Sequence, residues 1–326
     1  MQNFGTMIRL AVLALLVFVS FCSYCDARQN NSKTIDGINL GSAGQPPILR
    51  TAKELRAFHF SRDGGILPED HYDVPARVRL LQKRFKHQLC DLITGLLNQD
   101  RGPVSPDGFR SAIRLQLRDL GLLNPSAMEH GPNYTYGHVL DVTVKAVPQH
   151  TDLLAVGVII DVYWDQDESL YIFQHSETGW TNILAAEVND YSNIADAQSS
   201  RFNYVVSPPA ADGSWFVVTS SVNPHKASAW QHVTYTALVP GPDALHPRKL
   251  VRRTHALYVG GDDESHACTL TATAIGFHVR FIGDIVDSAG QYYNYDYKVD
   301  RRAARLVRAK CVTNPIPGVD GRCSLR

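Results

Sequence analysis

Residues 136–164, YGHVLDVTVKAVPQHTDLLAVGVIIDVYW, decide the fold class of this chain. From Val139 to Ala146 the two sets of alternate positions differ, with Asp141, Thr143 and Lys145 on one side and apolar residues on the other. This period of two predicts a strand with one buried face. A second β-rich run follows at 153–164, which predicts another strand.

Strand-like runs continue through the C-terminal half of the sequence. They lie at 168–175, 180–187, 202–207, 214–221, 230–239, 250–259, 268–275, 277–282, 291–299 and 303–309. Turn residues such as Asp212-Gly213 and Pro240-Gly241 separate them. Because no helical segment interrupts about a dozen strands, we expect an antiparallel β-domain over residues 136–310, in a propeller-like or a sandwich form.

A weak internal repeat bears on that choice. The segments LLAVGVIIDV at Leu153, SWFVVTSSV at Ser214 and GFHVRFIGDIV at Gly276 begin 61 and 62 residues apart. Three similar units suggest blade-like repetition. Chance spacing within an all-β chain is the alternative, and the sequence does not decide between them.

Helical periodicity precedes the strands, within residues 51–125. After Pro75, apolar residues recur at steps of three and four, at Val78, Leu81, Phe85, Leu89, Leu92 and Leu96. A second stripe follows Ser105-Pro106 and consists of Phe109, Ile113, Leu117 and Leu120. The capping-box spacing of Thr51 and Glu54 indicates a short helix before them. The sequence therefore predicts an α+β protein, mostly antiparallel β, with an N-terminal helical hairpin.

The first 27 residues carry the features of a secretory signal peptide. A positive charge precedes an apolar run from Leu10 to Phe21, and Ala27 supplies a small residue before a cleavage site. The run is shorter than the roughly 20 apolar residues that a membrane-spanning helix needs. We therefore expect a cleaved signal over residues 1–27, a secreted or periplasmic protein, and no membrane span after cleavage. The polar residues 28–50 predict a flexible leader.

Four cysteines follow the signal, and an oxidising compartment favours their pairing. Cys311 and Cys323 bracket a loop-like segment in the C-terminal tail, residues 311–326, so we expect a bridge between them. The remaining pair would be Cys90 with Cys268. A free buried thiol at Cys90 is the alternative, because that residue lies in an apolar helix.

Acidic residues cluster where the second strand is followed by the third. If Asp165, Asp167 and Glu168 lie on a hairpin turn, their carboxylates converge, and hard oxygen ligands suit Ca²⁺. A solvated turn is the competing interpretation. The sequence indicates no other cofactor.

Tyrosines and basic residues mark two candidate surfaces. Tyr293, Tyr295 and Tyr297 share one face of a strand, where they form either a ligand platform or a packing ladder. The basic run RRAARLVRAK at 301–310 can dock a sugar acid, a phosphate or an acidic partner. It can also pair with the acidic stretch at 149–200, and we favour this second interpretation. His225 and His232 match no metal-binding pattern and indicate surface histidines.

Composition narrows the function without naming it. Lys plus Arg and Asp plus Glu number 32 each, so no global field favours nucleic acid. No GxSxG, GxxxxGK[ST] or GxGxxG motif occurs. We therefore expect a non-enzymatic exported binding or scaffold protein with an unidentified extracytoplasmic ligand. The alternative is a secreted hydrolase of a polymer such as a polysaccharide, with its acid and base among Asp161 to Glu168.

Overall fold

The computed structural model describes ten segments of the chain. They are residues 46–58, 76–99, 104–125, 136–162, 165–187, 201–224, 230–258, 268–286, 289–300 and 302–313. The predicted signal peptide, residues 28–45 of the predicted leader and residues 314–326 of the predicted tail lie outside the described residues.

In the described part of the chain, three helices precede the strands: α2 (Pro47–Arg56), α3 (Ala76–Leu97) and α4 (Pro106–Asp119). Ser105 precedes α4 and Pro106 is its first residue, as the sequence predicts. The first helix begins earlier than its capping box indicates, because Pro47 occupies the first turn and Thr51 donates a hydrogen bond to the Pro47 carbonyl inside the helix. None of these helices is long and apolar enough to cross a membrane.

The buried face of α3 departs from the predicted stripe in its last turns. Phe85 and Leu89 are fully buried as expected, but Ile93 and Leu97 follow them into the core in place of Leu92 and Leu96. The apolar face advances in steps of four here, so Leu92 and Leu96 are only partly buried. Among the helices, α3 packs chiefly on α2, and α4 packs chiefly on β1. A helical hairpin is therefore not shown.

The strands that the structure describes pair antiparallel and form three four-stranded sheets. Sheet 1 contains β1 (Val139–Ala146), β2 (Leu153–Val162), β3 (Asp165–Ser176) and β4 (Gly179–Glu187). Sheet 2 contains β5 (Arg201–Val206), β6 (Val217–Pro224), β7 (Trp230–Val239) and β8 (Arg248–Tyr258). Sheet 3 contains β9 (Thr269–Thr273), β10 (Gly276–Val286), β11 (Ala289–Val299) and β12 (Ala304–Thr313).

Each sheet is a meander whose strands follow one another in sequence order. Two of the three repeated segments coincide with β2 and β10, and the third overlaps most of β6; these are the second strands of the three sheets. The spacing therefore reflects a repeated structural unit. The described sheets do not close into a ring, so the propeller form is not seen.

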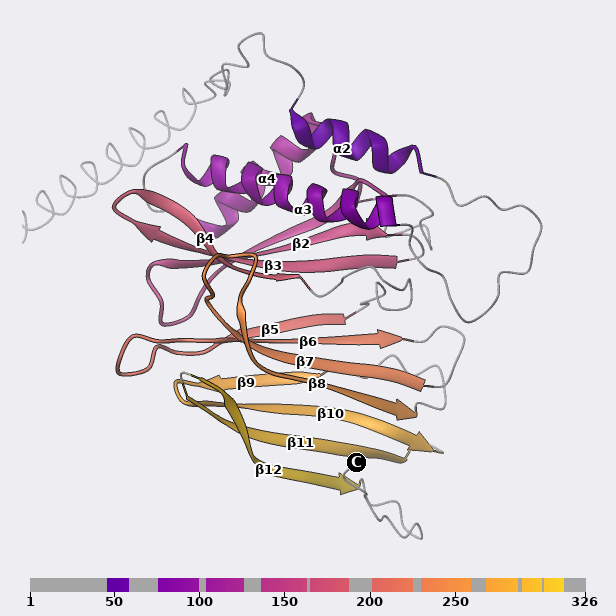
Figure 1. Cartoon of the computed structure of the whole chain (residues 1–326), viewed down its shortest axis with the longest axis vertical. Helices are drawn as coiled ribbons and strands as arrows, with labels where there is room; N and C mark the ends of the chain where they lie inside the picture. Colours follow the sequence, from indigo (N-terminus) through magenta and orange to yellow (C-terminus); the bar gives the residue numbers. More distant parts are fainter. Residues whose placement is uncertain are drawn as a thin grey trace, which may run out of the picture. The chain divides into compact units, whose positions relative to one another are not determined.

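The helices and the three sheets are stacked in succession (Figure 1). Apolar side chains join each layer to the next. The helices cover one face of sheet 1, where Phe85 and Leu89 share a core with Val156 and Tyr171. The opposite face of sheet 1 packs on sheet 2 through residues such as Leu170 and Val217. The other face of sheet 2 packs on sheet 3. Sheet 2 is therefore packed on both faces.

Candidate ligand-binding site

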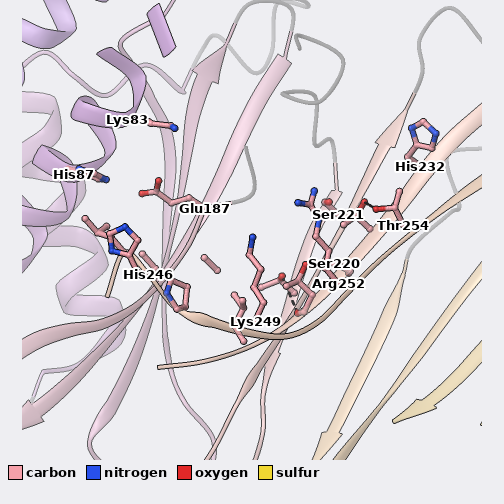
Figure 2. A pocket seen from close by; sticks show the side chains of 18 residues that line it. Lys83, His87, Glu187, Ser220, Ser221, His232, His246, Lys249, Arg252 and Thr254 are labelled. Carbon is pink, nitrogen blue, oxygen red and sulfur yellow. Dashed lines mark hydrogen bonds between the residues drawn. The ribbon is translucent and has the colours of Figure 1, made fainter. Parts of the chain in front are cut away.

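A cleft of about 650 Å³ is lined by α3, by the end of β4 and by the β6–β8 face of sheet 2 (Figure 2). β4 is an edge strand of sheet 1, whereas β7 and β8 extend the facing surface of sheet 2. The chain between β7 and β8 contributes the rim through Leu245, His246 and Pro247.

Side-chain hydroxyls cover the sheet 2 wall of the cleft. The strand register aligns Ser221, Thr234 and Thr254 in one cross-strand row. It aligns Thr219, Thr236 and Arg252 in the next row. All six residues line the cleft because alternate residues of a strand face the same side. Their neighbours in sequence, such as Val218 and Tyr235, face the core between sheets 2 and 3.

Among the described residues that line this cleft, cations outnumber carboxylates. Lys249 and Arg252 come from β8, Lys83 comes from α3, and Glu187 at the end of β4 is the acidic residue of the lining. Within the described residues, none of these three cations forms an ion pair. Glu187 accepts a hydrogen bond from the Tyr171 hydroxyl at 3.2 Å. The charge balance of the cleft therefore favours an anion.

Hydrogen bonds fix the rim of the cleft. The Ala185 amide of β4 donates to the Ala244 carbonyl at 2.7 Å, which attaches the β7–β8 connection to sheet 1. Asp243 accepts hydrogen bonds from the Leu245 and His246 amides at 3.0 Å, and its Oδ1 lies 2.8 Å from Nδ1 of His246. The His246 side chain and these amides lower the pKa of the Asp243 carboxyl. His246 is thereby held at the cleft entrance.

The residues of the predicted Ca²⁺ site lie in β3 and not in a turn. Oδ2 of Asp167 lies 2.5 Å from Nζ of Lys86 on α3, and both side chains are buried. Glu168 points to the opposite face of the strand because successive residues alternate. Burial, followed by the charge of Asp167, raises the pKa of Glu168 to about 7. The structure therefore does not bring Asp167 and Glu168 together, and the Asp165 side chain lies outside the described residues.

The predicted tyrosine platform lies in the core between sheets 2 and 3. Tyr293, Tyr295 and Tyr297 are each only 5% exposed. The ring of Tyr297 stacks on Phe277 with centroids 4.6 Å apart, and its hydroxyl lies 2.7 Å from that of Tyr235. These tyrosines form a packing ladder and offer no surface for a ligand.

Cys90 and Cys268 are free, buried thiols. Cys90 belongs to the core between the helices and sheet 1, whereas Cys268 belongs to the core between sheets 2 and 3. The predicted bridge between them is therefore absent, and the alternative of a free thiol at Cys90 describes the structure. Cys311 lies in β12 and not in a tail. Its side chain and Cys323 lie outside the described residues, so that bridge stays a prediction.

Local acids pair with the basic run of β12. Nε of Arg308 lies 2.6 Å from Oδ2 of Asp296 on β11, and Nε of Arg305 lies 3.8 Å from Oδ2 of Asp300. Asp296 lies in β11 and Asp300 directly follows that strand, so neither partner belongs to the acidic stretch at 149–200. Of the two histidines considered from sequence, His232 lines the cleft and His225 lies outside the described residues.

Sequence reasoning missed most of the cleft, including Lys249, Arg252 and the threonine rows. The available signal was the alternation of hydroxyl residues in VVTSSV and TYTAL, which places Thr219 with Ser221, and Thr234 with Thr236, on shared faces. No protein-family model matches the sequence, and no curated protein has significant similarity to it. The site must therefore be interpreted from its own chemistry.

Proposed function

We propose that this protein is an exported binding protein that holds a small anionic ligand in the cleft between α3, β4 and sheet 2. The observation that carries the proposal is the presence of Lys83, Lys249 and Arg252 around one carboxylate, Glu187. Like charges that share a concave surface repel one another, and a bound anion relieves that repulsion. Export follows from the signal-like features of residues 1–27.

The polar wall supports the same function. Thr219 and Ser221 are buried, and they share the cleft wall with Thr234 and Thr236. Hydroxyls both donate and accept hydrogen bonds, so they can orient the polar groups of a ligand. A cleft of this volume falls within the range of small-molecule sites.

The hydrolase alternative receives less support from the geometry. Asp161 and Asp167 are fully buried, and they contact His138 and Lys86 respectively. Glycoside hydrolysis requires two carboxylates that face the substrate across a shared site. Of the acids considered for that reaction, Asp161, Asp167 and Glu168 are described and do not line the cleft, so ligand binding is the better-supported function.

Thermal unfolding in the presence of simple anions tests the proposal. We expect sulfate or phosphate to raise the melting temperature of the parent protein above its value in NaCl of equal ionic strength, because a ligand that binds the native state stabilises it. The double variant Lys249→Gln/Arg252→Gln should lose this ligand-specific increment. Sulfate and phosphate also stabilise proteins non-specifically, so the difference between parent and variant is the relevant quantity.

Arg253→Gln is the matched control. Arg253 is exposed and adjacent in sequence, but it is not among the residues that line the cleft. Its substitution should leave the anion response unchanged. An equal anion response in the parent and in the Lys249→Gln/Arg252→Gln variant would rule out the cleft as the binding site.

A further inference from the structure

Hydroxyl groups in the cleft form a two-dimensional array. Neighbouring strands place partners such as Thr219 and Thr236 about 4.8 Å apart, and alternate residues such as Thr234 and Thr236 lie about 6.7 Å apart along the strand. The cross-strand spacing is close to the separation of hydroxyls on alternate carbons of a sugar ring. The wall can therefore meet several hydroxyls of one saccharide at once.

Arg252 extends one row of this array. Because it pairs with Thr236, its side chain starts from the position next to that hydroxyl, with Thr219 one strand further away. A guanidinium binds carboxylate, sulfate or phosphate through two parallel hydrogen bonds. Lys249 lies near it on the same strand. An oxyanion held at Arg252 thus places the rest of the ligand over the threonines.

A site that hydrogen-bonds its ligand discriminates against a molecule that lacks a matching group, because the hydrogen-bonding groups of the site then lose a partner. Thr219 and Ser221 are 6% and 3% exposed, so their hydroxyls lie at the base of the cleft and away from bulk water. The Thr219 hydroxyl donates to the Thr236 carbonyl at 3.5 Å, and the Thr234 and Thr254 hydroxyls lie 2.9 Å apart, but each hydroxyl oxygen keeps further acceptor capacity. A ligand with several hydroxyls can donate to these oxygens, whereas a bare inorganic anion binds the cations and has no hydroxyl to donate to the threonines.

We propose that the ligand is an acidic sugar, meaning a saccharide that bears a carboxylate, sulfate or phosphate group. This inference rests on the proposed function and names the ligand class of the same cleft. The oxyanion binds Arg252 and Lys249, and the sugar hydroxyls bind the rows that contain Thr236 and Thr234.

Calorimetric titration of the full chain tests this proposal. The acidic probes are glucuronate, galacturonate, glucose 6-sulfate and glucose 6-phosphate. The reference probes are glucose, galactose, inorganic sulfate and inorganic phosphate. We expect at least one acidic sugar to bind about tenfold more tightly than both its neutral sugar and the inorganic anions, since two net hydrogen bonds correspond to about that factor or more. The acidic sugar that binds identifies the oxyanion.

Thr236→Val separates the sugar contacts from the anion contacts. Valine keeps the shape of threonine and removes its hydroxyl. We expect a severalfold loss of affinity for the acidic sugar, with inorganic anion binding unchanged. Thr271→Val is the control because Thr271 is an exposed residue of sheet 3 that does not line the cleft, and neither affinity should change.

The outcomes distinguish this inference from the function on which it rests. Inorganic anions that bind as tightly as every acidic sugar would overturn the sugar assignment and leave an anion-binding cleft. A neutral sugar that binds as well as its acidic counterpart would also overturn it. Failure of all acidic sugars and all inorganic anions to bind would overturn both proposals.

Discussion

Lys86 and Asp167 meet in the interior between α3 and β3, at a distance of 2.5 Å. Near them, the fully buried Asp161 accepts a hydrogen bond from the His138 amide at 2.8 Å and lies 2.9 Å from its ring nitrogen. Charges removed from water are tolerated when each has a close partner. Asp167 therefore joins α3 to sheet 1, whereas Asp161 holds His138 beside the start of β1. Both carboxylates are engaged with these partners and do not form the Ca²⁺ site expected from the sequence.

The pKa of Glu168 predicts how the stability of the protein depends on pH. Burial and the neighbouring Asp167 raise its pKa from 4.5 to about 7, so the folded state holds this proton more tightly than the unfolded state. Stability should fall as pH rises from about 4.5 to about 7, and the full cost should remain above pH 7. Glu168→Gln should remove this dependence and stabilise the protein at about pH 8 by no more than roughly 3 kcal/mol.

Urea unfolding at about pH 5 and about pH 8 measures the effect. Glu177→Gln, in the exposed turn after β3, is the control and should keep the pH dependence of the parent. If the Glu168→Gln variant and the parent lose the same stability between the two pH values, the raised pKa of Glu168 does not govern this region.

Each strand and helix could be predicted separately, because its pattern of apolar residues depends only on its own sequence. Alternation within residues such as Val139 to Ala146 depends only on which side chains meet the core, so every strand of the described sheets was anticipated, with boundaries shifted by a few residues. The face of α3 was predicted for its first turns and then drifted to Ile93 and Leu97. A small difference between the repeat of the pattern and that of the helix accumulates along the element.

The residues that α3 buries predict which substitutions in this helix destabilise the protein. Ile93→Asp should unfold the protein or abolish its expression, because Ile93 is fully buried and an unpaired buried carboxylate costs several kcal/mol. Arg84→Asp should change the free energy of unfolding by less than about 1 kcal/mol, since Arg84 is exposed on the same helix. Leu92→Asp should fall between them because Leu92 is partly buried.

Chemical denaturation of the three variants decides the order. Equal loss of stability in the Ile93→Asp and Arg84→Asp variants would show that the buried face of α3 has been assigned to the wrong residues. A Leu92→Asp variant less stable than Ile93→Asp would restore the stripe expected from sequence.

The cleft could not be predicted from sequence because it depends on packing between elements. Lys83 belongs to α3 and Arg252 to β8, and only the placement of the β4 edge beside sheet 2 brings them to one surface. Hydroxyls at Thr234 and Thr236 are visible in the sequence as an alternation, but a solvated strand has the same pattern. Burial of Thr219 and Ser221 is what distinguishes the wall from an ordinary surface.

The described part of the molecule is a series of layers that differ in how many of their faces pack against another layer. The helices cover one face of sheet 1, and sheet 2 has apolar contacts on both faces. Sheet 3 packs on sheet 2 through one face, while its other face carries polar residues such as His278, Asp296 and Arg308. A polar outer face removes the need for a further sheet, so the repeat can end without closing into a ring.

Because sheet 2 is packed on both faces and sheet 3 on one, we expect the two sheets to differ in local stability. Hydrogen exchange should be slowest in β6 and β7, the inner strands of sheet 2, and faster in sheet 3, because opening sheet 3 exposes only one apolar face. Phe281→Ala should increase this difference. Phe281 is 1% exposed and packs against Tyr293 and Tyr295, and truncation of a buried phenylalanine costs about 3–5 kcal/mol.

Exchange measured by mass spectrometry on peptides from each sheet distinguishes a layered response from a global one. In the Phe281→Ala variant we expect faster exchange in β10 and β11 and little change in β2 and β3, because sheet 2 separates these two regions. Thr271→Ala, an exposed change in the same sheet, should leave all exchange rates near those of the parent. Equal acceleration in all three sheets would mean that the layers unfold as one cooperative unit, since energy lost at the interface between sheets 2 and 3 would then lower the stability of sheet 1 by the same amount.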